Sequence, residues 1–241
     1  MVQHVTQQIP RDIDMLEKPP IVVLTSLCKY YSQGLEPINA VDGIDLKVNS
    51  GDFFLITGRS GSGKTTLLSL IGGLTAPTSG EIHIEGENLS EMDDSQLSTL
   101  RARKIGFVFQ FASLIPTLTA LDNVRLPGLF SGHDPSEDDV HDLFKWVGLT
   151  NKTGNYPSQL SGGQQTRIAV ARSLVNRPTL LLADEPTGNL DLQTEQEIME
   201  LLMNINQAKG ITILMVTHNP ELSKFANRHI IMDNGKISQI K

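Results

Sequence analysis

The chain is organised around one stretch, Gly58-Arg59-Ser60-Gly61-Ser62-Gly63-Lys64-Thr65, which fits the phosphate-loop pattern G-x-x-x-x-G-K-[ST]. Before it, the apolar run 53–56 is typical of a buried strand that ends at Thr57. Behind it, apolar residues recur at helical spacing, at Leu67, Leu68, Leu70, Ile71 and Leu74. The sequence therefore predicts a strand, a glycine-rich loop and a helix that begins near Lys64, which is the arrangement that the pattern requires.

This loop has the residue types that hold phosphate. Its glycines let the backbone curl around an anion, and the loop N–H groups and the helix N-terminus point at that anion. Lys64 can reach the β- and γ-phosphates of a nucleotide, and the Thr65 hydroxyl can hold Mg²⁺. We predict that residues from Gly58 to Thr66 bind the nucleotide. The alternative, a glycine-rich turn before an ordinary helix, is disfavoured by the flanking elements.

Composition indicates one large globular domain, or a domain with a sub-lobe. The chain has 241 residues, of which 39% are hydrophobic and 20% are charged, so it can bury a core. The net charge of −7 argues against a nucleic-acid surface, which usually needs a clustered basic excess. We therefore expect no nucleic-acid partner.

Cysteine use and hydropathy indicate the compartment. The single cysteine, Cys28, cannot form an internal disulfide, which is consistent with a reducing compartment, and it is interpreted as a small apolar strand residue. No apolar run approaches the roughly 18 residues of a membrane helix, and the N-terminus lacks the pattern of a signal peptide. We expect a chain that is soluble by itself and that can still dock on a membrane protein.

The pattern of strands and helices changes along the chain. Residues 1–20 are polar and end in two prolines, so we expect a loose tail, and we assign residues 21–241 to one domain. Strand patterns occupy residues 21–27, 44–48, 81–85, 105–109, 180–183 and 211–216. From 112 to about 172 helical patterns take over, with a helix start at Ser136, so this range is predicted as a helical sub-lobe.

The end of the chain completes the fold-class prediction. Residues 228–233 and 236–240 flank Asn234-Gly235, the favoured two-residue turn of a hairpin. Continuous apolar strands that alternate with helices indicate a mostly parallel sheet covered on both faces. The predicted fold class is α/β: a phosphate-loop NTPase core with a mostly parallel sheet, an antiparallel β portion and a helical sub-lobe.

Two acids follow the apolar strand 180–183. Asp184 and Glu185 stand where α/β sheets bind ligands, at the carboxyl end of a strand. Asp184 can hold the Mg²⁺ shell. Glu185 points in another direction and can accept a proton from a water that attacks the γ-phosphate. The alternative, two acids that cap a turn before Pro186, is weakened by the presence of the phosphate loop.

A second candidate anion site is Leu160-Ser161-Gly162-Gly163-Gln164, which precedes a helix with apolar residues on one side. A serine and two glycines at a helix N-terminus can bind an anion. The pentapeptide taken alone also fits a capped helix with a flexible entry, because serine is common at an N-cap.

In this order, these motifs resemble the nucleotide-binding subunit of ATP-binding cassette (ABC) transporters. The set is the phosphate loop, Gln110 after a strand, residues 160–164, the Asp-Glu strand end, Asn189-Leu190-Asp191, and His218 after a strand. The resemblance runs from about Ile21 to the C-terminus. It implies the ABC ATPase fold and a competent ATPase with ATP and Mg²⁺.

The resemblance also implies roles for single residues. Tyr31 matches the aromatic that stacks on adenine, and Tyr30 is the competing candidate; an aromatic at a strand edge is the alternative for both. Gln110 matches the residue that touches Mg²⁺ and water and reports to the membrane partner. His218 matches the switch histidine that contacts the γ-phosphate.

A dimer is a further implication of the resemblance. Residues Ser161 to Gln164 would contact ATP held by a second copy of the chain, so that two ATPs lie between two subunits. Asn189 to Asp191 would link the two sites. Loss of the γ-phosphate would then open the dimer.

Within the family, the stretches 72–80, 106–110 and 116–124 resemble the lipoprotein-releasing and macrolide-exporting subclass. This implies an integral membrane permease as partner, which places the chain in the cytoplasm, on the inner face of the cell membrane. Residues 111–126 would help shape the groove for the permease, or simply pack the helical sub-lobe. A regulatory cell-division ATPase that signals without transport, and a soluble non-transport ABC ATPase, are the alternative functions.

Overall fold

The computed structural model describes residues 19–33, 36–132 and 134–240. The predicted tail, residues 1–20, lies outside the described residues except for Pro19 and Pro20. Pro20 already belongs to the first strand, β1 (Pro20–Gln33). No helix within these described ranges is both long and apolar enough to cross a membrane.

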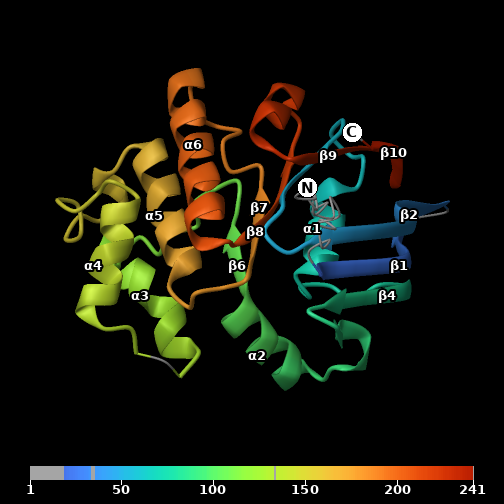
Figure 1. The fold of residues 1–241 in the computed structure, drawn as a ribbon, viewed down its shortest axis with the longest axis horizontal. Helices are drawn as coiled ribbons and strands as arrows, with labels where there is room; N and C mark the ends of the chain where they lie inside the picture. Colours follow the sequence, from blue (N-terminus) through green and yellow to red (C-terminus); the bar gives the residue numbers. More distant parts are fainter. Residues whose placement is uncertain (1–18, 34–35, 133, 241) are drawn as a thin grey trace, which may run out of the picture.

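The chain forms two sheets (Figure 1). The larger sheet has the order β10-β9-β3-β8-β7-β6, and all its neighbours are parallel except the pair β9–β10. Its strands are β3 (Phe53–Thr57), β6 (Ile105–Val108), β7 (Leu180–Asp184), β8 (Thr212–Thr217), β9 (Arg228–Asp233) and β10 (Lys236–Ile240). The predicted mostly parallel sheet and the C-terminal hairpin are confirmed.

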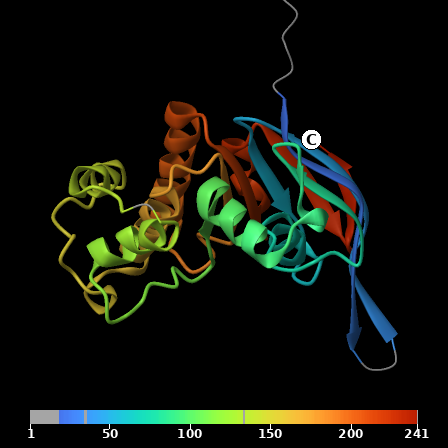
Figure 2. The ribbon, with the colours of Figure 1, turned by 90° about the horizontal axis from the view of Figure 1, so that it is seen from below.

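The smaller sheet is antiparallel, with the order β2-β1-β4-β5. Its other strands are β2 (Glu36–Asn49), β4 (Ser79–Ile84) and β5 (Glu87–Asn88). Strands β1 and β2 are longer than the sequence patterns predict and extend as a hairpin beyond the body of the molecule (Figure 2). This sheet is the predicted antiparallel portion.

Helices cover the larger sheet. α1 (Lys64–Ile71) follows the phosphate loop, and α2 (Asp94–Lys104) leads into β6. Between β6 and β7 the chain forms α3 (Ala120–Phe130), α4 (Glu137–Trp146), η2 (Pro157–Gln159) and α5 (Gly162–Leu174). α6 (Leu192–Lys209) lies between β7 and β8, and the short 3₁₀ segments η1 (Leu89–Glu91) and η3 (Pro220–Phe225) complete the fold. In Figure 1, α3, α4 and α5 gather on one side of the larger sheet and the antiparallel strands on the other.

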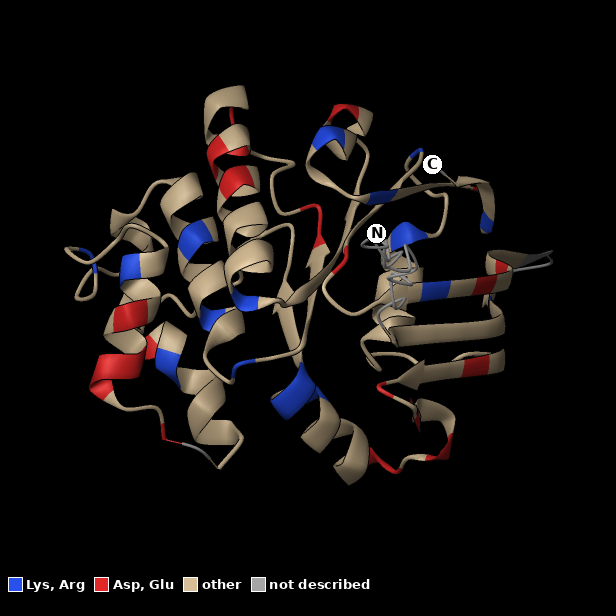
Figure 3. Ribbon diagram, viewed as in Figure 1, with Lys and Arg blue, Asp and Glu red and all other residues tan. Residues whose placement is uncertain are grey.

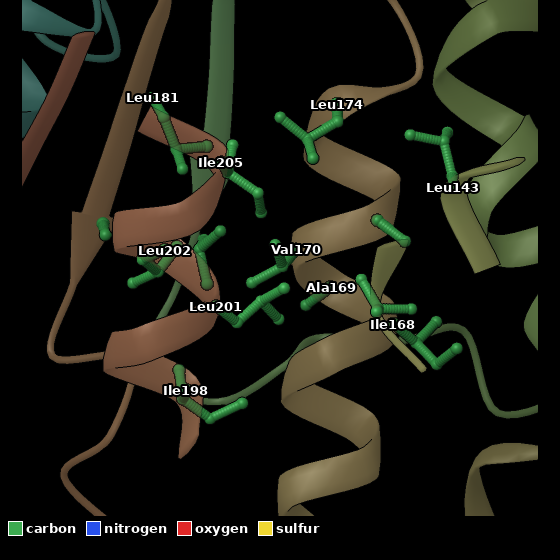
Figure 4. Close-up of a cluster of buried hydrophobic side chains, with 14 of the residues drawn as sticks. Leu143, Ile168, Ala169, Val170, Leu174, Leu181, Ile198, Leu201, Leu202 and Ile205 are labelled. Atoms are coloured by element: carbon green, nitrogen blue, oxygen red, sulfur yellow. The ribbon is translucent and has the colours of Figure 1, made fainter. Parts of the chain in front are cut away.

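Alternation along the parallel strands explains their continuous apolar sequence. In β3, Phe53 and Leu55 pack with the cluster under α5 and α6, whereas Phe54 and Ile56 pack with α1 and the antiparallel sheet. β7 and β8 alternate in the same way. Figure 4 shows the first cluster, where side chains of α5 and α6 meet each other and Leu181 of β7. The interior of a strand that is buried on both faces is apolar, so the polar site residues lie at the strand ends or follow them.

Three positions differ from the sequence pattern. Leu74, predicted in the helical stripe behind the phosphate loop, lies beyond α1 and is 49% exposed, because Gly72 and Gly73 end the helix. A second helical stripe is predicted by the spacing of Leu192, Ile198, Leu201, Leu202 and Ile205. Leu192 is the first residue of α6 and is 81% exposed, so it does not join the buried part of that stripe. β6 ends at Val108, and Phe109 lies outside the strand with its ring stacked on Phe107.

Candidate functional site

The phosphate loop connects β3 to α1 and leaves the start of α1 open. The N-cap is Gly63, in the left-handed region with φ 97°, and no side chain caps the helix. A Cβ at Gly63 would lie 2.0 Å from the carbonyl oxygen of Ala40, so only glycine fits there. The first N–H groups of α1 therefore have no side-chain partner and face the loop, as an anion site requires.

Lys64 is held inside the loop. Its Nζ donates to the carbonyl oxygens of Gly58 and Arg59, each at 2.9 Å. The side chain is 6% exposed, and this burial lowers the pKa of Lys64, while the nearby carboxylates of Glu185 and Asp184 oppose the shift. The ammonium group is thus poorly solvated and is satisfied mainly by two neutral carbonyls, which suits it to an anionic ligand.

Ser62 provides a test of whether the loop fits phosphate. Its hydroxyl oxygen is buried and is the one such side-chain atom without a hydrogen-bond partner in the described parts of the chain. Buried polar groups normally find partners. The backbone of Ser62 is held in place by the β9–β10 turn, because the Gly235 N–H donates to the Ser62 carbonyl at 3.1 Å. A phosphate oxygen in the loop would supply the missing partner.

Thr65 and Asp184 meet at the mouth of the loop. Thr65 Oγ1 donates to Asp184 Oδ1 at 3.0 Å. Burial raises the pKa of Asp184, and the neighbouring Glu185 carboxylate adds to the shift, while the Thr65 hydrogen bond opposes it. These two oxygens suit Mg²⁺, which prefers oxygen ligands and takes phosphate and water for the rest of its shell. A metal site made wholly of protein side chains is a different case: within the described ranges, no cluster of three or more His, Cys, Asp or Glu residues could hold a metal ion.

Glu185 and His218 form a pair at the ends of adjacent strands. Glu185 follows β7 and His218 follows β8, and Nδ1 of the histidine lies 2.5 Å from Oε2 of the glutamate. Glu185 has φ 47°, which is unusual for a residue with a side chain, and its N–H donates to Val216 at 2.9 Å. The neighbouring carboxylates thus have different partners, Thr65 for Asp184 and His218 for Glu185.

A cavity of about 380 Å³ brings these groups together. Its lining residues are Ile38, Ala40, Ser60, Gly61, Ser62, Gly63, Lys64, Thr65, Thr66, Gln110, Glu185 and His218. Gln110 and Glu185 lie beside the same stretch of backbone, since a Cβ at Gly188 would be 3.6 Å from Gln110 Nε2 and 3.5 Å from Glu185 Oε2. Of the remaining predicted residues, Asp184 bonds to Thr65, and Gly58 and Arg59 offer their carbonyls to Lys64.

The two candidate aromatics lie on different faces of the β1–β2 hairpin. Tyr31 is paired with Ile38 across the hairpin, so both side chains lie on the face that reaches the cavity. The Tyr30 hydroxyl instead donates to Asp42 at 3.4 Å. This register supports Tyr31 over Tyr30 as the aromatic beside a nucleotide, although neither lines the cavity itself.

Residues Ser161 to Gln164 lie outside the cavity, at the start of α5. Ser161 caps the helix: its hydroxyl accepts from the Gln164 N–H at 3.3 Å, and Gln164 Oε1 accepts from the Ser161 N–H at 3.0 Å. Asp191 caps α6 in the same way, accepting from the N–H of Thr194 at 3.0 Å. The two helix starts are close, because a Cβ at Gly163 would be 2.4 Å from Thr194 Cγ2.

Several residues that shape the site were not predicted. Ile38 and Ala40 line the cavity from β2, and Gly235 supports the loop. Arg172 of α5 donates to the carbonyls of Ser113 and Ala112, at 2.7 and 2.8 Å, and so holds the segment after Gln110. Among these residues, only Gly235 had a sequence signal, because it belongs to the Asn-Gly turn. That signal predicted a hairpin and did not predict a contact with the phosphate loop.

Comparison with known proteins shows what the chain is similar to. Residues 41–188 match the sequence model of the ABC transporter family. The chain is 44% identical over 223 residues to the macrolide export ATP-binding/permease protein MacB of Rhodopirellula baltica, covering 91% of this chain and 33% of that protein. It is 41% identical over 222 residues to the lipoprotein-releasing system ATP-binding protein LolD of Xanthomonas euvesicatoria, covering 91% of each. The chain thus spans about a third of the first relative and most of the second.

Solved structures show the same arrangement of elements. The dimeric, post-hydrolysis state of the ATP-binding cassette MJ0796 bound to ADP and Pi has a TM-score of 0.84 and 40% identity, with 91% of this chain and 97% of that chain covered. The protein cbiO1 from Clostridium perfringens, part of the ABC transporter complex cbiONQ, has a TM-score of 0.82 and 29% identity, with 92% and 88% covered.

Proposed function

This chain belongs to the ABC transporter family, and we propose that it is the ATP-hydrolysing subunit of an export or extraction complex. Two copies would close around ATP and drive an integral membrane permease. One observation carries the proposal: Lys64, Gln110, Glu185 and His218 line the same cavity as the phosphate loop. These are the groups that hydrolysis of a terminal phosphate needs: a cation, a base and residues that position the attacking water.

Each side chain has a distinct task in hydrolysis. Lys64 moves from its two carbonyl partners to the phosphates, and the open start of α1 donates N–H groups to them. The Glu185 carboxylate accepts a proton from the attacking water, and His218 holds that carboxylate in place and faces the γ-phosphate. Thr65 and Asp184 would hold Mg²⁺, which neutralises negative charge on the phosphates when bound.

The position of Ser161 to Gln164 supports a dimer with shared sites. This segment is at a helix start, so its N–H groups can face an anion, yet it lies outside the cavity of its own chain. A second copy, turned to face the first, would bring it to the open side of that cavity. The similar cassette MJ0796 is dimeric in the structure with ADP and Pi.

The surface after Gln110 supports a membrane partner. Phe111 is 70% exposed, and Ile115 also presents an apolar side chain to solvent. Exposed apolar groups of this kind mark interaction sites. We propose that residues 111–126 receive the permease, which places the chain in the cytoplasm on the inner face of the cell membrane. The similarity to MacB and LolD favours export or extraction of macrolide or lipoprotein type over signalling without transport.

Charge distribution is consistent with this assignment. Figure 3 shows basic and acidic residues on both halves of the molecule, with a basic stretch at the end of α2. Within that stretch, Arg101 donates to the Gly73 carbonyl and Lys104 pairs with Glu85 and Glu87. Two of the three cations in this stretch are thus engaged inside the chain, and Arg103 alone is exposed, which is too small a basic patch for a nucleic-acid surface.

Two experiments test the proposal. Lys64→Ala should abolish binding of a fluorescent ATP analogue, whereas Lys47→Ala on the surface should not; normal binding by Lys64→Ala would contradict the site. Tagged Glu185→Gln chain, incubated with ATP and detergent-solubilised membranes, should retain a permease with a large external domain. A small division-type membrane protein would favour signalling instead, and ribosomal proteins would refute the transporter assignment.

A further inference from the structure

A second hollow, of about 1120 Å³, lies at the opposite end of the parallel strands. It is bordered by Thr179 before β7 and Ile211 before β8, whereas the phosphate cavity lies after the other ends of these strands. No residue lines both hollows. Its apolar lining comes from four parts of the fold: Pro19, Pro20, Ile21, Leu143, Trp146, Leu174, Val175, Pro178 and Ile211. We refer to this hollow as the β-start groove.

Charged groups around the β-start groove are already paired. Arg177 bonds to Asp139 and Lys145 to Asp142, each at 2.8 Å, and the Lys209 ammonium lies 4.6 Å from the centre of the Trp146 ring. Glu85 pairs with Lys104 at 2.7 Å. The groove therefore has no free cluster of one sign that would select a nucleotide or another charged small molecule. What the groove offers a ligand is apolar surface, which includes Trp146, a residue that is 38% exposed.

The chain itself enters the β-start groove at its rim. Pro19 is a lining residue, and its carbonyl oxygen accepts from the Ser50 N–H at 3.0 Å, so this point is anchored to the body. Residues 1–18, outside the described ranges, are joined directly to it. They carry apolar side chains at Val2, Val5, Ile9, Ile13, Met15 and Leu16. An extended chain spans at most about 3.6 Å per residue, so Leu16 is tethered within roughly 11 Å of Pro19.

We propose that the β-start groove binds residues 1–18 of the same chain, chiefly through Ile13, Met15 and Leu16. The tether makes this binding intramolecular, with an effective concentration in the millimolar range, so modest apolar burial is enough to hold it. The bound segment would pack against α4 and against the starts of β1 and β8. This inference is independent of the proposed function, because it concerns the end of the strands away from the phosphate cavity.

Trp146 is the only tryptophan and lines the β-start groove, so it reports on the occupant. Tryptophan emission and acrylamide quenching are compared for the full chain and for residues 19–241. We expect the deletion to shift emission to longer wavelength and to increase quenching. A synthetic peptide of residues 1–18, added to the shortened chain, should reverse both changes with saturation. Identical emission and quenching in the two chains would overturn the proposal.

Point variants separate binding from the effects of a deletion. Ile13→Asp combined with Leu16→Asp in the full chain should reproduce the deletion, whereas Gln7→Asp combined with Gln8→Asp should not. All variants should keep the ATP hydrolysis rate of the full chain, which shows that they fold. Tryptophan emission is also measured at several protein concentrations for the full chain and for residues 19–241. If it changes with concentration equally in both chains, a second copy covers the groove and the proposal is wrong.

Discussion

The Oε2 atom of Glu185 lies 2.5 Å from Nδ1 of His218, although 33 positions separate the two residues in the chain. Adjacent parallel strands bring them together, since β7 and β8 end at the same edge of the sheet. The glutamate side chain is 15% exposed and the histidine 62%, so the carboxylate is the sheltered member of the pair. In this arrangement the contact with His218 orients the Glu185 carboxylate.

The pair is expected to act as one unit in hydrolysis. Glu185→Gln should keep ATP affinity and lower turnover about 10²–10⁴-fold, the usual contribution of a general base. His218→Ala should also lower turnover, and the double variant should be little slower than Glu185→Gln alone, because residues that act as a unit are not additive. Phosphate release and equilibrium ATP binding are the measurements, with the exposed Glu221→Gln as control. If the fold-loss of turnover in the double variant equalled the product of the two single losses, the two residues would have independent roles.

Tyr31 is expected to contact the base of the nucleotide. Its cross-strand partner Ile38 lines the phosphate cavity, whereas Tyr30 is turned to Asp42. Loss of a stacked aromatic costs about 1–3 kcal/mol, so Tyr31→Ala should weaken ATP binding by roughly tenfold. Tyr30→Ala is the matched variant and should have a much smaller effect. Titration with a fluorescent ATP analogue measures both, and the reverse order of effects would reject the assignment.

Local sequence patterns were sufficient to predict most of the fold and the part of the site at the carboxyl ends of the parallel strands. The interiors of the strands around the phosphate loop are apolar because both faces are buried, and β3, β7 and β8 each end on a polar residue. Asp184 and Glu185 were therefore predictable, since α/β sheets bind ligands at the carboxyl ends of their strands. The role of His218, which follows β8 at the same edge, came only from the resemblance to ABC ATPases. The phosphate loop was predictable from its glycine-rich motif, which lies between an apolar strand and a helical pattern.

Contacts between distant segments that carry no motif were not predictable. Ile38 reaches the cavity only through the register of a long hairpin, and the sequence patterns for β1 and β2 were shorter than the strands. The bonds from Arg172 to Ala112 and Ser113 join residues 60 and 59 positions apart, with no motif at either end. Leu192 fitted a helical period and is nevertheless exposed, because the period cannot tell where the buried face of a helix begins.

Asp184 is expected to make stability depend on pH. Burial raises its pKa above the ordinary value of 3.8, so the folded chain favours the protonated carboxyl and its ionised form opposes folding. Asp184→Asn keeps an oxygen for the Thr65 hydroxyl and removes the charge. Without nucleotide and Mg²⁺, it should therefore melt at a higher temperature than the unmodified chain at pH 7.5. The difference should shrink as pH falls through the raised pKa toward 3.8.

Thermal melting at several pH values measures this effect. The stabilising change should coincide with weaker Mg²⁺-dependent ATP binding, because the same carboxylate is proposed to hold the ion. Asp233→Asn, at an exposed position, is the control and should show neither trend. A melting difference that is constant with pH, or of opposite sign, would show that the charge of Asp184 is not the cause.

The two glycines at the start of α5 should respond differently to alanine. A Cβ at Gly163 would lie 2.4 Å from Thr194 Cγ2, and Thr194 is fixed by its 2.6 Å hydrogen bond to Asp191. A Cβ at Gly162 would lie 3.4 Å from Leu190, an ordinary contact. Gly163→Ala should thus destabilise the chain by about 1–3 kcal/mol, whereas Gly162→Ala should be nearly neutral. Denaturant unfolding compares them, and equal effects would exclude crowding against Thr194 as the cause.

Arg172 is expected to position the segment that carries Gln110. Its guanidinium donates to the carbonyls of Ala112 and Ser113, and burial lowers its pKa without removing the charge. The same helix begins at Ser161, so α5 connects the predicted second anion site to the Gln110 segment. Without the guanidinium, two carbonyls lose charged hydrogen bonds that are worth about 1.5–3 kcal/mol each at most.

Arg172→Ala should therefore lower turnover about tenfold while leaving ATP affinity within about twofold, because the phosphate loop keeps its own contacts. Arg167→Ala is the matched variant: it lies on the same helix but bonds to Val147 and Glu197. It should lower the melting temperature without the selective loss of turnover. Steady-state phosphate release, together with ATP-analogue titration, separates the two. If both variants lose turnover and stability in the same proportion, Arg172 supports only the fold of α5, because a positioning role requires a loss of rate that exceeds the loss of stability.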